Sequence, residues 1–140
     1  MKVLLAIDGS EYTKRMLSYI AAHNELLGQG HEYHVLTVVP PVPQYAARFL
    51  ERSTLDGFYA EQAEVVLKPV RAFAAQQQWR AEMVYLHGHP AETIAAYAAS
   101  IEADLIVMGT HGHSALTSAV LGSVASGVLA RCARPVLLVH

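Results

Sequence analysis

The sequence predicts an α/β protein in which a five-stranded parallel sheet lies between two layers of helices. Short apolar runs alternate along the chain with longer stretches of helical periodicity, which is the pattern of repeated βαβ units. Several of these runs are apolar throughout, as expected for strands that helices cover on both faces. The 140 residues are 53% hydrophobic and 16% charged, and this composition is typical of one compact domain, 1–140, with a well-buried core.

Five apolar runs are predicted to be the strands. They are KVLLAI, YHVLTVV, AEMVYL, DLIVM and PVLLV, at residues 2–7, 33–39, 81–86, 104–108 and 135–139. The first run follows Lys2 as in a signal peptide, but Asp8 ends it after five apolar residues and no small-residue cleavage site follows. The amino-terminal segment is therefore interpreted as a strand.

The first helix is expected to begin at Ser10, a good N-cap residue, and to continue to Leu27 before two glycines. A second helix is predicted over residues 55–78, where Pro69 lacks a backbone donor and should kink or split it. A third is predicted to begin at Pro90, because proline suits the first helical turn.

The segment at residues 40–49, PPVPQYAARF, contains too much proline to continue either a strand or a helix. It is the one long connection in the chain, and long connections are often functional or mobile. Nearby aromatic residues either form a lid over a ligand or, as we expect for several of them, pack the second helix onto the sheet; they are Tyr45, Phe49, Phe58 and Tyr59.

Charge and composition argue against several classes of partner. The formal net charge is -2 and the pI is near 6.4, so the chain offers no basic surface for nucleic acid or anionic lipid. No apolar run approaches the 18 or so residues of a membrane span. The single cysteine, Cys132, cannot form an internal disulfide, which favours a cytoplasmic location. Its neighbours on the last predicted helix are apolar, so we expect a small buried side chain and no nucleophile.

Spaced glycines follow the fourth predicted strand, where a parallel sheet usually binds its ligand. Gly109 and Gly112 suit a tight turn that exposes amide N–H groups. Gly122 and Ser123 open the last helix, whose first amides and dipole favour an anion. The pattern predicts a phosphate cradle, in which a side chain at Gly122 would fill the phosphate space and leave the fold largely intact. The alternative is that the glycines only turn the chain and let the helix pack on the sheet.

The complete pattern resembles the nucleotide-binding signature of the universal stress protein family. The resemblance extends over nearly the whole chain and includes VLLAIDGSEYT, GHPAETI, ADLIVMGTHG, LGSVASGVL and RPVLLV. The spaced-glycine motif marks the branch of the family that binds ATP. The resemblance implies a Rossmann-like, adenine nucleotide alpha hydrolase-like fold with strand order 3-2-1-4-5, which would bring Asp8 opposite Gly109.

The resemblance also implies roles for individual residues. Asp8 matches an acidic residue near the ribose and the metal–phosphate region, where it could contact Mg or Mn; otherwise it caps the following turn. The positions implied to contact the nucleoside or the phosphates are Ala6, Val38, Val39, Met108, Gly109, Gly112, Gly122, Ser123 and Val124. His111 and His113 are added to this binding set because of their place in the glycine loop.

Two H-x-H pairs raise the alternative of a zinc site, formed by His87, His89, His111 and His113. Zinc prefers three or four ligands held in a tetrahedral shell, which alternate loop residues rarely provide. We therefore expect His111 to shape the glycine loop or to lie at the edge of the phosphates. His113 could make the site depend on pH.

The resulting hypothesis is an ATP-binding regulator or sensor of the stress response that acts on a protein partner the sequence does not identify. The resemblance implies a homodimer joined through the last strand, which would cover an apolar sheet edge. Slow ATP hydrolysis is possible, but residues 109–127 contain no Lys or Arg to act on the phosphates. The alternatives are a dimeric scaffold that ignores nucleotides and an adenylating or ATP-hydrolysing enzyme of related architecture.

Overall fold

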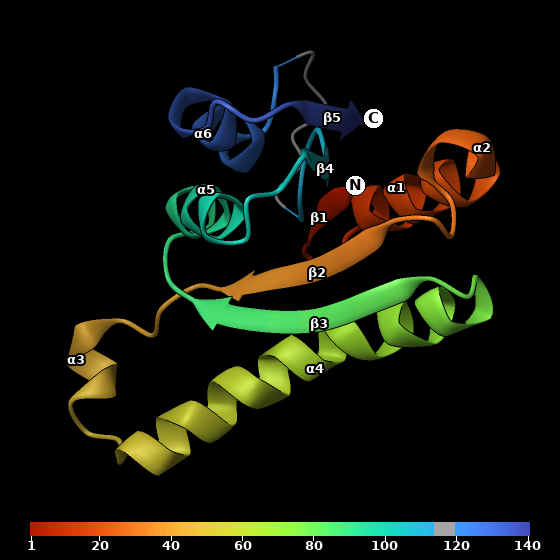
Figure 1. Ribbon diagram of the computed structural model, residues 1–140. Helices are drawn as coiled ribbons and strands as arrows, with labels where there is room; N and C mark the ends of the chain where they lie inside the picture. The colour runs from red at the N-terminus through yellow and green to blue at the C-terminus, as the bar shows by residue number, and fades with distance from the viewer. Residues whose placement is uncertain (114–119) are drawn as a thin grey trace.

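The computed structural model contains a five-stranded parallel sheet with helices on both faces (Figure 1), and it describes residues 1–113 and 120–140. The strand order is β3-β2-β1-β4-β5. The strands are β1 (Lys2–Ile7), β2 (Glu32–Val39), β3 (Arg80–His87), β4 (Leu105–Gly109) and β5 (Val136–Val139). The predicted fold class and strand order are confirmed, and each strand boundary lies within one residue of its prediction.

Six helices are described, and the four longer ones form the outer layers. They are α1 (Glu11–Ala22), α2 (Asn24–Leu27), α3 (Gln44–Ala47), α4 (Arg52–Gln76), α5 (Pro90–Ser100) and α6 (Ser123–Arg131). Helices α1 and α4 share one hydrophobic cluster with alternate residues of β1, whereas α5 and α6 share a second cluster with the intervening residues. Because successive strand residues point to opposite faces, β1 is buried on both sides.

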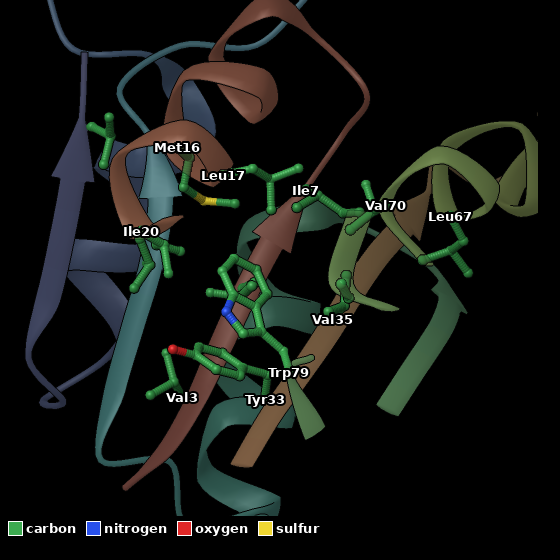
Figure 2. Packing of buried hydrophobic residues seen from close by; sticks show 14 of the residues in the cluster. Val3, Ile7, Met16, Leu17, Ile20, Tyr33, Val35, Leu67, Val70 and Trp79 are labelled. Carbon is green, nitrogen blue, oxygen red and sulfur yellow. The ribbon is translucent and has the colours of Figure 1, made fainter. Parts of the chain in front are cut away.

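The core beneath α1 and α4 is built around aromatic and branched side chains (Figure 2). Tyr33 stacks on Trp79 with ring centroids 4.9 Å apart. Its hydroxyl donates to the carbonyls of Leu27 and Gly28, which fixes the end of α2 against the sheet. Burial raises the pKa of Tyr33 to about 12, because the phenolate would lose its hydration there.

The first predicted helix is wrong in two details. It is interrupted at His23, so that α1 and α2 are separate. The His23 ring Nδ1 bonds to the Tyr19 carbonyl at 2.8 Å and competes with the backbone for the same acceptor. Ser10 occupies the N-cap position, but its hydroxyl makes no capping bond and is buried without a hydrogen-bond partner among the described residues.

The proline-rich connection and the second helix also differ from prediction. Residues 44–47 form the short helix α3, because the last proline of the segment, Pro43, precedes them at a position that tolerates a missing N–H. Helix α4 continues without a break through Pro69. The proline lies on the exposed side of α4, so water can satisfy the Val65 carbonyl that has lost its donor.

Only one of the four aromatic residues near α3 packs in the core. Tyr59 is buried, stacks on His87 at 4.5 Å, and accepts the Val42 N–H at 2.9 Å. Tyr45, Phe49 and Phe58 are exposed, so the expectation that several of them pack α4 holds for Tyr59 alone.

The start of α5 agrees with the prediction, whereas the position of Cys132 differs from it. Pro90 begins α5 as predicted. Cys132 lies just beyond the end of α6, not on it, and is half-buried against the second core cluster. None of the helices among the described residues is both long and apolar enough to span a bilayer.

Candidate functional site

A crevice of about 720 Å³ opens at the carboxyl ends of β1, β2 and β4. At this point the winding of the sheet reverses: the chain leaves β1 for β2 on one side, whereas β4, which the chain reaches from β3, pairs with β1 on the other side. Open parallel sheets form their ligand sites at such a point. Ala6 pairs in register with Leu36 and with Met108, so the three strands end at the same level.

The crevice is lined by all twelve residues that the sequence nominated for binding. They are Ala6, Asp8, Val38, Val39, Met108, Gly109, His111, Gly112, His113, Gly122, Ser123 and Val124. Residues from positions 6 to 124 meet there because the carboxyl ends of parallel strands lie at one edge of the sheet.

One end of the crevice is apolar. Leu36 and Met108 are almost fully buried, and Ile94 on α5 and Ala125 on α6 close the same region. Val38 is half-buried at the strand end. Such a wall suits a flat apolar or aromatic group, which gains from leaving water.

The opposite end contains Asp8, and its carboxylate organises the β1–α1 turn. Asp8 Oδ1 accepts the Ser10 N–H at 2.9 Å and the Thr13 hydroxyl at 3.1 Å. The Thr13 oxygen in turn accepts the N–H groups of Asp8 and Gly9. Asp8 therefore performs the turn-capping role that the sequence raised as an alternative to ligand contact.

The second oxygen of Asp8 points at the glycine loop. A Cβ built on Gly112 would lie 2.6 Å from Asp8 Oδ2. The implied partner was Gly109, whereas the structure brings Asp8 beside Gly112. Gly109 packs instead against Tyr12, whose Cβ would be 2.6 Å from a Cβ at position 109.

Two histidines hold the loop in place. The His111 Nε2–H donates to the Val120 carbonyl at 2.5 Å, while its Nδ1 bonds to the Thr110 hydroxyl at 3.0 Å. The His113 Nε2–H donates to the Asp8 carbonyl at 2.6 Å. Both side chains thus tie the loop to fixed backbone, in agreement with the loop-shaping role expected for His111. Residues 114–119 of the glycine motif lie outside the described residues.

The glycines of the motif permit close approach of the chain to itself. Gly122 donates to the Thr110 carbonyl at 2.8 Å. A Cβ at Gly122 would lie 2.7 Å from that carbonyl oxygen and 3.1 Å from the His111 Cα. The expectation that a side chain there leaves the fold intact is therefore wrong, because it would collide with backbone. Neither Gly109 nor Gly112 has the positive φ that a tight turn can require; Gly9 has it, at 77°.

The four histidines proposed as a zinc alternative do not converge. His87 stacks on Tyr59 and His111 is bonded to Val120. Within residues 1–113 and 120–140, no three His, Cys, Asp or Glu side chains are grouped as metal ligands.

Sequence reasoning missed several residues that line the crevice, notably Tyr12, Thr13 and Thr110. Thr13 lies five residues after Asp8, and this short separation was the available signal, because Thr hydroxyls often bond to nearby polar groups at turns and helix starts. Tyr12 and Thr110 carry no local signal, since Tyr12 contacts His111 from a distant segment and the Thr110 backbone bonds to Gly122 and Val139.

The electrostatics of the crevice depend on one carboxylate and one helix end. Among its described lining residues, Asp8 is the only one with a formal charge at neutral pH when the histidines are neutral. Helix α6 begins at Ser123 with Gly122 as its N-cap. The first N–H groups of a helix have no partner within the helix, and the dipole there favours an anion. The site therefore offers main-chain donors to an anionic group.

Comparison with known proteins identifies related chains over the full length. A model of the universal stress protein family matches residues 1–140. A universal stress protein from Thermus aquaticus is 38% identical over 139 residues, which covers 99% of this chain and 97% of the relative. The solved structure of hypothetical protein MJ0577 superposes with a TM-score of 0.82 at 26% identity, covering 99% of this chain and 94% of the other.

Some solved structures of the same fold contain adenine nucleotides. The universal stress protein from Archaeoglobus fulgidus in complex with dAMP has a TM-score of 0.71 and 20% identity, with coverage of 100% of this chain and 98% of that one. A further universal stress protein was solved with cAMP, and one from Arabidopsis thaliana with AMP, at TM-scores of 0.67 and 0.70.

Proposed function

The chain belongs to the universal stress protein family, and from this premise we propose that its crevice binds an adenine nucleotide, with ATP as the physiological ligand. In this proposal the adenine lies against the apolar end and the phosphates lie at the glycine loop and the start of α6. The observation that carries it is the meeting of an apolar wall and a helix N-terminus in one crevice at the sheet's switch point. The adenylate complexes of relatives support the choice of base.

The ligand's anionic end would be held mainly by backbone N–H groups. The amides at Ser123 and Val124 belong to the first turn of α6, where helices bind phosphate. The Ser123 side chain is exposed at the crevice and adds a hydroxyl donor.

A divalent cation, Mg²⁺ or Mn²⁺, fits beside Asp8 as a companion of the phosphates. Asp8 Oδ1 is occupied by Ser10 and Thr13, whereas Oδ2 faces the glycine loop. Magnesium is commonly held by one or two carboxylates together with substrate phosphates and water, so Asp8 Oδ2, which makes no hydrogen bond to the described residues, is enough. The cation would reduce the repulsion between Asp8 and a triphosphate.

Rapid ATP hydrolysis is not part of the proposal. Phosphoryl transfer uses cationic groups and a positioned base at the transferred phosphate. The described residues that line the crevice include neither Lys nor Arg. We propose a regulator that changes its interaction with a protein partner when nucleotide binds, and that forms a homodimer through β5.

Calorimetric titration tests the binding proposal directly. ATP and AMP should bind with a stoichiometry of one per chain, and GTP should bind far more weakly. ATP at about 100 times its dissociation constant should raise the free energy of unfolding by about 2.7 kcal/mol. ATP affinity should fall when EDTA removes divalent cations.

One control variant and one contradicting outcome make the result decisive. Asp8→Asn keeps an oxygen for Ser10 and Thr13 but loses the charge, so it should abolish the effect of Mg²⁺ without lowering the melting temperature. If neither ATP nor AMP releases heat or changes the melting temperature of the wild-type protein, the crevice is not a nucleotide site and the nucleotide-independent scaffold is the better account.

A further inference from the structure

A second cavity, which we call the α1–α4 groove, lies directly beside the phosphate end of the crevice. Its volume is about 420 Å³. The groove and the crevice share five lining residues: Asp8, Thr13, Val65, Val66 and His113. Space therefore continues from the Asp8 end of the crevice into the gap between the two helices that cover this face of the sheet.

The walls of the α1–α4 groove are mainly apolar. Leu17 from α1 faces Val70 and Phe73 from α4, and the exposed Val65 forms the rim nearest the crevice. The floor is closed where Gly9 lies against Val66, since a Cβ on Gly9 would be 3.3 Å from Val66 Cγ2. Polar side chains are the minority of the lining, and its apolar walls suit a flexible hydrocarbon group.

Two polar features lie at the groove's edge. Lys14 is the sole Lys or Arg among the described residues that line either cavity. Its ion pair with Glu11 is 3.8 Å long and exposed, so the ammonium group can turn toward a ligand at little cost. Pro69 has no N–H, so the Val65 carbonyl four residues earlier loses its helical donor, and both residues line the groove.

We propose that the α1–α4 groove is a subsite for an acyl chain attached through the phosphate of an adenine nucleotide, as in an acyl adenylate. This inference rests on the proposed nucleotide site, because the crevice must hold the adenosine end. The phosphate linkage would cross the shared boundary at Asp8 and Thr13, with Lys14 beside its single negative charge. The hydrocarbon chain would then lie between Leu17 and Phe73. A free triphosphate leaves these apolar walls unused, whereas an acyl adenylate covers them.

A stable analogue provides the test. The affinity of 5′-O-(N-decanoylsulfamoyl)adenosine is compared by calorimetry with that of 5′-O-(N-acetylsulfamoyl)adenosine, which has the same anionic linkage but a two-carbon acyl group. Burial of only part of the chain should make the decanoyl compound bind at least about tenfold more tightly to the wild-type protein. AMP is titrated alongside to report on the nucleotide site itself.

A pair of matched variants tests whether the gain in affinity arises in the α1–α4 groove. Ser18 is exposed and lines the groove, whereas Ser100 is exposed at the end of α5 and lines neither cavity. Ser18→Glu places a carboxylate among the apolar walls, where the chain would have to desolvate it, and should remove most of the gain. Ser100→Glu should retain the gain, and AMP affinity should stay close to that of the wild type in both.

The outcomes separate the two proposals. If AMP binds but the decanoyl group adds no affinity, the acyl subsite is wrong and the nucleotide site stands. If the gain survives in Ser18→Glu, the chain binds elsewhere and the subsite is also wrong. If none of the adenosine compounds binds, both proposals fail together.

Discussion

Gly122 lets two backbone segments that form the crevice pack closely against each other. Its N–H donates to the Thr110 carbonyl, and its Cα lies so close to Thr110 and His111 that no Cβ fits. The contact joins the end of β4 to the start of α6. The glycine is thus required by the chain's own packing before any ligand is considered, and the proposed phosphate site depends on that packing.

Gly122→Ala should lower the free energy of unfolding by about 1–3 kcal/mol, because the added methyl group overpacks a contact between backbone segments. It should also weaken nucleotide binding by displacing the start of α6. The control is Gly30→Ala, since a Cβ at Gly30 meets no atom within 4 Å and should change stability by less than about 0.5 kcal/mol. Urea denaturation measures both. Equal stability of the two variants would show that the loop yields freely at Gly122.

At the residue scale, the sequence predicted which residues come together but not how the backbone packs around them. The twelve residues, most of them implied by the family resemblance, line one crevice, and their role in binding stays a prediction. The predicted reason for a glycine at position 122, space for the phosphates alone, was wrong. The close pairing of two backbone segments cannot be predicted from either segment alone. Tyr12 was missed for the same reason, since its packing against Gly109 joins α1 to β4.

At the scale of elements, α4 is distinctive because a 25-residue helix continues through a proline. Pro69 is exposed, and its neighbours Leu67 and Val70 are buried against the sheet. Packing of the buried face therefore holds the helix together despite one missing hydrogen bond, as tertiary contacts commonly outweigh propensity. This is why the predicted split did not occur, whereas the strands, whose apolar runs contain no such conflict, were predicted to within one residue.

Pro69→Ala should stabilise the protein by about 2 kcal/mol, because alanine restores a donor for the Val65 carbonyl and is the better helix residue. Lys68→Ala, at the exposed neighbouring position, is the matched control and should change stability by less than about 0.5 kcal/mol. The stability of both variants is measured by chemical unfolding, monitored by circular dichroism near the helix minimum at about 222 nm. A Pro69→Ala protein no more stable than the control would mean that α4 has adapted fully to the proline.

The interruption between α1 and α2 could not be predicted from the sequence, because it depends on one hydrogen bond of the His23 imidazole ring. The apolar positions Met16, Leu17 and Ile20 continue to Leu27 in a way that one helix would satisfy. In the structure the His23 ring bonds to the Tyr19 carbonyl, and α2 then directs Leu27 into the core beside Tyr33.

At the scale of the whole molecule, the sheet has two edges of different character. The β3 edge carries Arg80 and Glu82, and charges of this kind discourage pairing with another chain. The β5 edge, Val136–Val139, carries no charged side chain, and within the described part of the chain it pairs with β4 alone. The contrast supports β5 as the strand through which two copies would join.

The proposed dimer can be tested through one backbone N–H. The carbonyls of Pro135 and Val139 accept the N–H groups of Ile106 in β4 and of Thr110 directly after it, at 2.9 and 3.0 Å. Because alternate residues of a parallel strand bond to the same neighbour, the N–H of Leu138 faces away from β4. Leu138→Pro removes that donor without removing a bond to β4, and proline is tolerated on an edge strand in this orientation. Leu138→Ala loses the same side chain but keeps the N–H.

Light scattering coupled to size exclusion should therefore give a dimer for the wild type and for Leu138→Ala, and a monomer for Leu138→Pro. The reason is that antiparallel pairing of two β5 edges needs the outward N–H of each, and proline both removes it and obstructs the approaching chain. A dimeric Leu138→Pro protein, or a monomeric wild type, would place the association elsewhere. Nucleotide titration of the monomeric variant then tests whether one chain forms a complete crevice. We expect unchanged affinity, because the lining residues all come from the same chain.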